Sequence, residues 1–161
     1  MDLLNKWEGA WSRHAVYYAN GTPGSNWSYG EQFAVIVTGY SVVLTQPPQY
    51  SDDFHPNDSP PYNGPTTSIS YSPSLTTTQP SLIARVFCCQ PYTSGPYAPV
   101  YPVGATLNQS YQLAPDMSTA DGYMVAIAHE MQSSAGAAGT AGWTMNMGYR
   151  EDSLALTIAI F

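Results

Sequence analysis

The chain has 161 residues and a net charge of −7, and only 9% of its residues are charged, against about 25% in an average soluble domain. Its length favours a single domain, residues 1–161, that buries its own core. The four Lys and Arg residues are scattered, which argues against nucleic acid and anionic membranes as partners.

No targeting or membrane-spanning segment is expected. The longest apolar run falls far short of the roughly 20 residues that a transmembrane helix needs. The first residues lack a basic stretch followed by an apolar one, so no secretory signal is predicted.

The N-terminal residues have two interpretations. Four large apolar side chains fall at helical spacing between residues 2 and 12: Leu3, Leu4, Trp7 and Trp11. Asp2 is suited to cap such a helix. Residues 1–12 are therefore predicted to form a short helix or a docking arm. Residues 13–19 have the aromatic and β-branched content of a strand, and residues 20–25 have turn chemistry.

The longest apolar segment is residues 33–45, which is predicted to be a central strand with a bend at Gly39. Proline is then concentrated between Pro47 and Pro80. Because proline cannot donate to a β-ladder, we expect a long loop over residues 46–80 with one short edge strand at 68–71. Long loops in compact domains are often functional, which makes this loop a candidate partner-facing surface.

The second half of the chain alternates strands with loops. Strands are predicted at 82–89, 106–113 and 122–131, with a Pro/Tyr-rich loop at 90–102 between the first two. Residues 133–142 are almost all small and are expected to be flexible.

The last segment, residues 154–161, alternates strictly between a wide face, which begins with Leu154, and a slim face, which ends with Phe161. Residues 143–149 alternate too, and a four-residue connection, 150–153, predicts that the two strands form a terminal hairpin. Phe161 is expected in the core or at a subunit contact.

About seven or eight strands with long Pro/Tyr-rich loops indicate an all-β domain. We favour a two-sheet β-sandwich of jelly-roll type, with an eight-stranded barrel as the alternative. Loop length decides between them, because up-and-down barrels usually have short, regular connections.

No motif names a reaction or a metal centre. Cys88 and Cys89 are neighbours and are interpreted as two reduced, buried thiols, with a vicinal disulfide as the alternative. No partner histidine or cysteine lies at metal-ligand spacing from His14, His55 or His129. His129–Glu130 begins like a zinc-protease motif, but Ser133 stands where a second histidine is needed. No Gly-x-Ser-x-Gly elbow is present.

Two groups of residues are candidates for binding. Asp52, Asp53 and Asp58 are weak candidates for a cation site, against the simpler interpretation of a solvated acidic loop. The candidates for subunit contacts or for stacking on a sugar ring are aromatic: Trp27, Tyr29, Tyr50, Tyr62, Tyr92, Tyr97 and Tyr101. The low charge favours subunit contacts.

The composition therefore predicts a non-enzymatic structural protein that assembles with copies of itself into a symmetric object. A viral or phage particle is the expected setting, as a coat, decoration or fibre-head domain, and other particle proteins or host glycans are further candidate partners. No cofactor is expected. The expected location is the virion, with the cytoplasm or non-classical release as alternatives. A lectin-like carbohydrate-binding module is the second hypothesis, and a small barrel enzyme with a tyrosine-lined pocket is the third.

Overall fold

The computed structural model describes residues 2–8, 13–20, 44–55, 67–91, 106–113, 123–146 and 150–161. Its elements are all strands: β1 (Asp2–Glu8), β2 (Arg13–Tyr18), β3 (Gln49–His55), β4 (Thr67–Ser72), β5 (Thr76–Thr77), β6 (Ser81–Pro91), β7 (Thr106–Leu113), β8 (Tyr123–Gln132), β9 (Gly136–Ala137), β10 (Ala141–Asn146) and β11 (Arg150–Ile160). The predicted all-β class is confirmed. Within these ranges there is no helix with the length and apolar character that a bilayer crossing requires.

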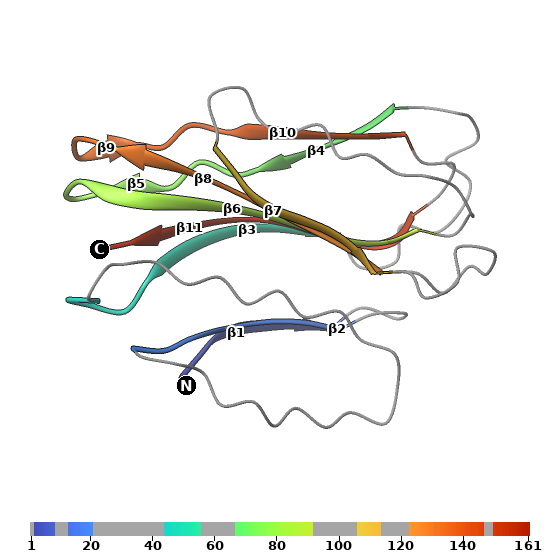
Figure 1. Cartoon of the computed structure of the whole chain (residues 1–161), viewed down its shortest axis with the longest axis horizontal. Coiled ribbons are helices and arrows are strands. Elements are labelled where there is room, and N and C mark those ends of the chain that lie inside the picture. Colours follow the sequence, from blue (N-terminus) through green and yellow to red (C-terminus); the bar gives the residue numbers. More distant parts are fainter. Residues whose placement is uncertain are drawn as a thin grey trace.

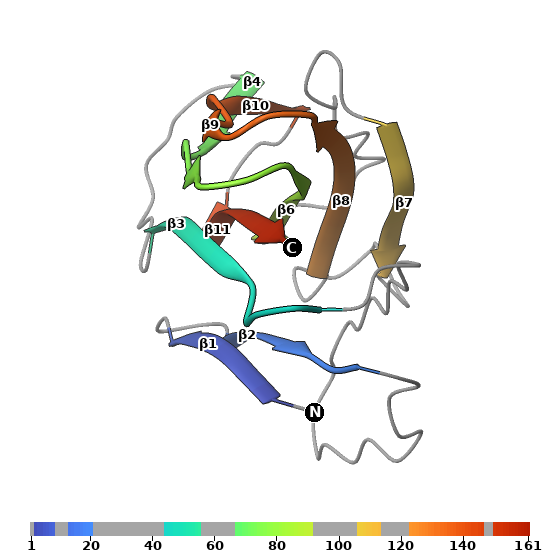
Figure 2. The same cartoon turned by 90° about the vertical axis from the view of Figure 1, so that its left-hand side faces the viewer.

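The central layer is a five-stranded antiparallel sheet in the order β3-β11-β6-β8-β7. The β1–β2 hairpin lies against one face of it, and the two-stranded sheets β4–β10 and β5–β9 lie against the other (Figures 1 and 2). None of the sheets built from the described residues closes into a barrel, so these strands do not form the alternative architecture. The predicted strands at 82–89, 106–113 and 122–131 correspond to β6, β7 and β8.

The final strand is confirmed and lies inside the sheet. Its wide face packs with β6, β8 and the hairpin in one core cluster: Trp7, Ala84, Val86, Ile127, Leu154, Leu156 and Ile158. Its slim face carries Ala155, Thr157 and Ala159, each at most 2% exposed. Small side chains let a neighbouring layer approach closely, and β4 contacts β11 on this side.

The predicted terminal hairpin is wrong. Both edges of β11 are already paired, one with β3 and the other with β6. Strand β10 instead pairs with β4, the edge strand predicted at 68–71. Because the short segment before β10 carries the chain out of the central sheet, two strands that are close in sequence end in different layers (Figure 1).

The N-terminal helix is also wrong, since residues 2–8 form β1. A register shift between Leu3 and Asn5 inserts one extra residue in β1 relative to β2. Such a bulge changes the phase of the alternation, so Leu4 and Trp7, three residues apart, both pack on the core cluster while Leu3 is exposed. This spacing of three produced the helical pattern.

The predicted loop from 46 to 80 contains a strand that the prediction missed. Residues Gln49–His55 form β3, which pairs with β11 along its length. Tyr50 and Phe54 lie on the same face of β3 and pack on the core. The acidic residues Asp52 and Asp53 between them hide this apolar face in the sequence. Most of the predicted strand at 33–45, including Gly39, and much of the loop at 90–102 lie outside the described residues.

Candidate functional site

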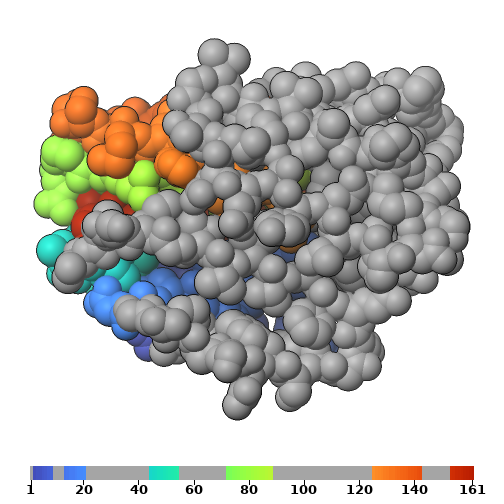
Figure 3. All heavy atoms as spheres, in the orientation of Figure 1, coloured from blue at the N-terminus to red at the C-terminus, as the bar shows by residue number. Residues whose placement is uncertain are grey.

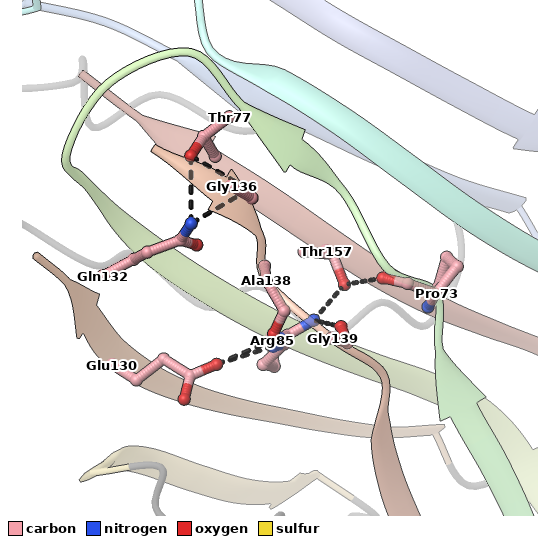
Figure 4. Close-up of polar contacts among 9 residues, drawn as sticks. All are labelled: Pro73, Thr77, Arg85, Glu130, Gln132, Gly136, Ala138, Gly139 and Thr157. Carbon is pink, nitrogen blue, oxygen red and sulfur yellow. Dashed lines mark hydrogen bonds and ion pairs between the residues drawn. The ribbon is translucent and has the colours of Figure 1, made fainter. Parts of the chain in front are cut away.

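The most extensive polar arrangement in the described part of the chain lies on the slim face of the central sheet. We call it the Arg85 cluster, and Figure 4 shows its members: Pro73, Thr77, Arg85, Glu130, Gln132, Gly136, Ala138, Gly139 and Thr157. Arg85 sits in β6 between the apolar residues Ile83 and Phe87 of the same face, and it is 1% exposed. A charge this deeply buried needs compensation from its neighbours.

The five N–H donors of the Arg85 guanidinium make five hydrogen bonds. Nε and Nη2 donate to Oε1 of Glu130, at 3.2 and 2.8 Å. Nη1 donates to the carbonyl of Gly139 at 3.0 Å and to Oγ1 of Thr157 at 2.8 Å. Nη2 also donates to the carbonyl of Ala138 at 2.7 Å. Since arginine has five such donors in all, none remains for an external anion.

Sheet register brings these partners together. Thr157 of β11 is paired directly with Arg85, and Glu130 of β8 is paired with Ile83, one diagonal step away on the same face. The Thr157 hydroxyl in turn donates to the carbonyl of Pro73 at 2.6 Å. The cluster therefore joins three strands of the central sheet to the layer above it.

A second set of contacts ties the ends of β5 and β9 together. Gln132 Nε2 donates to Oγ1 of Thr77 at 3.1 Å and to the carbonyl of Gly136 at 3.0 Å. The Thr77 hydroxyl donates to the same carbonyl at 3.3 Å. These side chains extend the two-residue ladder between β5 and β9.

On the opposite face, Trp7 attaches the hairpin to the central sheet. Its Nε1 donates to Oδ2 of Asp52 at 2.8 Å, and its ring meets Tyr50 edge-on with centroids 5.9 Å apart. His14 of β2 meets Phe54 in the same way at 6.0 Å. Asp52 thus serves as an acceptor for a buried indole, and Tyr50 is engaged within the chain.

The cation candidates do not converge in the described residues. Asp52 and Asp53 are consecutive in β3, so their side chains point to opposite faces. Asp58 lies outside the described residues. Within the described ranges, no group of three or more His, Cys, Asp or Glu side chains is placed to hold a metal ion.

Of the aromatic candidates, the structure places two. Tyr50 is half-buried beneath the hairpin. Phe161 is 7% exposed and packs with Ile83 and Ala159, so it lies in the core, the first of the two positions expected for it. The other candidates lie outside the described residues: Trp27, Tyr29, Tyr62, Tyr92, Tyr97 and Tyr101.

The hairpin carries the clearest exposed apolar pair in the described part of the chain. Leu3 and Tyr17 are 47% and 43% exposed, and they lie opposite each other in the β1–β2 register. Lys6 and Arg13, two of the four basic residues, are exposed on the same hairpin. Lys6 pairs with Glu8 at 3.3 Å, with both side chains more than half exposed. Figure 3 shows part of this hairpin at the lower surface of the molecule.

Cys88 is a free thiol that packs on the core cluster. Burial raises the pKa of Cys88 from 9.0 to about 12, because desolvation disfavours the thiolate. Because the pKa is raised, the Cys88 thiol of the folded chain keeps its proton above pH 9, where the same thiol in the unfolded chain loses it. The neutral thiol is therefore expected to be unreactive at neutral pH.

We predict that this thiol makes folding sensitive to alkaline pH. The contribution of Cys88 is fully present below pH 9 and is lost as pH rises from about 9 towards about 12, at up to about 1.4 kcal/mol per pH unit. Urea unfolding under reducing conditions at pH 7, 9 and 10.5 measures the slope. The Cys88→Ala variant, which retains all tyrosines, should lose less stability over this range. Equal slopes for the two proteins would refute the effect.

Two sets of polar contacts thus hold the layers together: the Arg85 cluster on one face of the sheet and the Trp7–Asp52 hydrogen bond on the other. The exposed pair Leu3 and Tyr17 belongs to the hairpin, which lies on the other side of the central sheet from the β5–β9 layer (Figure 1). Sequence reasoning missed the Arg85 cluster, although an arginine inside an otherwise apolar strand is a visible signal. The chain matches no family model, no curated protein and no solved structure.

Proposed function

We propose that the protein is a non-enzymatic structural component that assembles with copies of itself into a larger symmetric object, in the setting of a viral or phage particle. The observation that carries the proposal is the exposed pair Leu3 and Tyr17 on the hairpin, in a chain whose charged residues are only 9% of the total. Tyrosine and other large apolar side chains are enriched where proteins meet, and charged ones are depleted.

The charge distribution supports a second copy as the partner of this hairpin. Asp2, Lys6, Glu8 and Arg13 cancel one another, so the remainder of the chain carries the whole net charge of −7. The neutral hairpin exposes two anions, Asp2 and Glu8, as well as two cations, so a second copy with a net charge of −7 is repelled less at the hairpin than at the acidic remainder. A contact between two different patches is head-to-tail, and such contacts generate rings or helical arrays.

The polar contacts described above fit a structural role. The buried guanidinium spends all five of its donors on acceptors within the chain. Asp52 is used to hold Trp7. These groups bind the layers of one subunit to each other, which is what a rigid building block requires.

Light scattering after size exclusion, over a wide range of protein concentration, tests the proposal together with negative-stain electron microscopy. We expect a concentration-dependent oligomer. Because each copy carries a charge of −7, like-charge repulsion is screened by salt, so association should strengthen from low to physiological ionic strength. A monodisperse monomer at high concentration would contradict the proposal.

The role of the hairpin is tested by the double variant Leu3→Ser with Tyr17→Ser. Removing two exposed contact side chains should raise the apparent dissociation constant at least about tenfold. Met131→Ser is the matched control, because Met131 is 73% exposed on β8, outside the hairpin. If the double variant left the dissociation constant unchanged, the hairpin would not be the contact surface, and assembly would have to use another surface of the chain.

A further inference from the structure

The segment between β8 and β10, residues 133–140, crosses above the slim face of the central sheet. We call it the strap; it includes β9. Its residues are small, and all except Gly136 and Ala138 are exposed. Two glycines have positive φ, Gly136 at 143° and Gly139 at 71°. The strap therefore has few apolar contacts of its own, and its path depends on polar contacts at both ends.

Four sets of contacts hold the strap closed, and the first is the two-residue backbone ladder between β9 and β5. Arg85 donates to the carbonyls of Ala138 and Gly139. Gln132 and Thr77 donate to the carbonyl of Gly136. The backbone N–H of Ala138 donates to the carbonyl of Leu75 at 2.8 Å. Figure 4 shows Arg85 directed at the strap from the sheet beneath it.

The partners of Arg85 divide into two groups with different origins. Glu130 and Thr157 belong to strands of the central sheet, and Ala138 and Gly139 belong to the strap. If the strap moves away, the ion pair with Glu130 at 2.8 Å remains. Water then replaces the two lost carbonyls. The buried charge is never left uncompensated, which removes the largest cost that opening would otherwise carry.

Ala138 of the closed strap packs against an apolar cluster. Ile83, Ala159 and Phe161 are 0%, 0% and 7% exposed, and Leu75 and Ala138 pack against them. Opening the strap would remove Ala138 from this cluster and break the β5–β9 ladder, while the central sheet stays paired. The Phe161 cluster is thus the surface that the strap controls.

We infer that the strap is a built-in closure, which opens as a local unit while the central sheet stays folded and thereby uncovers the Ile83, Ala159 and Phe161 cluster. Arg85 is its latch. Local openings of this kind occur where few apolar contacts and mainly hydrogen bonds hold a segment. This device is independent of the assembly proposed above, and it exists in a single chain.

Native-state hydrogen exchange of the intact protein tests the inference. The amide of Ala138 reports on the strap, and the amide of Val86, in the middle of β6, reports on the central sheet. We expect the Ala138 amide to exchange at least about tenfold faster than Val86, with little dependence on added urea, because local opening exposes little surface.

Two variants separate strap opening from global unfolding. Ile158→Val removes one methylene from the core on the other face of the sheet and should speed Val86 exchange about threefold to tenfold. Exchange of the Ala138 amide should change less than twofold, because the contacts of Ile158 are the same whether the strap is closed or open. If Ala138 accelerates by the same factor as Val86, the strap opens only on global unfolding and the inference is overturned.

Gly139→Ala acts on the strap itself. A Cβ at this position would meet no atom within 4 Å, so the substitution adds only backbone strain at φ +71°. Forcing alanine into this left-handed conformation should speed Ala138 exchange about tenfold. Ser134→Ala, at an exposed strap position, is the control and should leave it unchanged. An unchanged Ala138 rate in Gly139→Ala would also overturn the inference.

Discussion

Replacing Arg85 with methionine should lower the free energy of unfolding by about 3–5 kcal/mol. Methionine keeps most of the length of the side chain, so the loss reports on the polar contacts and not on a cavity. Five hydrogen bonds disappear, and the carbonyls of Ala138 and Gly139 lose their donor in a partly buried place. Urea unfolding followed by circular dichroism measures the change.

The Glu130→Gln variant separates charge from hydrogen bonding at the same site. Glutamine offers an acceptor in place of the carboxylate but leaves the Arg85 charge without its counter-ion. Because the Arg85 guanidinium left behind is 1% exposed, losing its counter-ion is costly, although solvent access at Glu130, whose side chain is 32% exposed, offsets part of the loss, and we expect a cost of about 2–4 kcal/mol. Combining both substitutions should cost less than the sum of the single effects, since the two residues act on each other. If Arg85→Met lowered the free energy of unfolding by less than about 1 kcal/mol, Arg85 would not be the residue that holds the strap on the central sheet.

Replacing Trp7 with alanine is expected to cost about 3–5 kcal/mol and to detach the β1–β2 hairpin. Trp7 is the buried residue of β1 in the core cluster and is 7% exposed. A two-stranded hairpin is marginally stable without a surface to pack on. Amides of β1 and β2 should therefore lose protection from hydrogen exchange before amides of β6 do.

Trp7→Phe is the matched control for this prediction, because it keeps an aromatic ring in the core while removing the N–H that donates to Asp52 and part of the indole volume. Its cost should be about 1–2 kcal/mol, and Asp52→Ala, which removes the acceptor alone, should cost about 1 kcal/mol. If Trp7→Ala left the hairpin amides as protected as those of β6, the hairpin would be held by other contacts, and Trp7 would not be its anchor.

The strands whose pattern is strict could be predicted from the chain alone. The apolar run at 82–89 predicts a strand that is found as β6, and the alternation in 154–161 places its side chains on the correct faces, because successive residues of a strand point in opposite directions. The prediction failed where that rule is locally broken. The bulge after Leu3 moves Trp7 into phase with Leu4 and imitates a helix, and the acidic residues of β3 conceal its inward-facing Tyr50 and Phe54.

The sequence by itself determined the all-β class, the two-faced final strand and a surface poor in charge. Those properties depend on residue type and on near neighbours in the chain, so they can be read without knowing which distant residues meet. Tertiary structure alone decided the partners of β11, because pairing depends on which strands reach its edges. It also decided that Arg85 meets Glu130, 45 residues away, and Thr157, 72 residues away. Such contacts arise only when strand register has aligned distant side chains on one face, and no local pattern in the chain records that register.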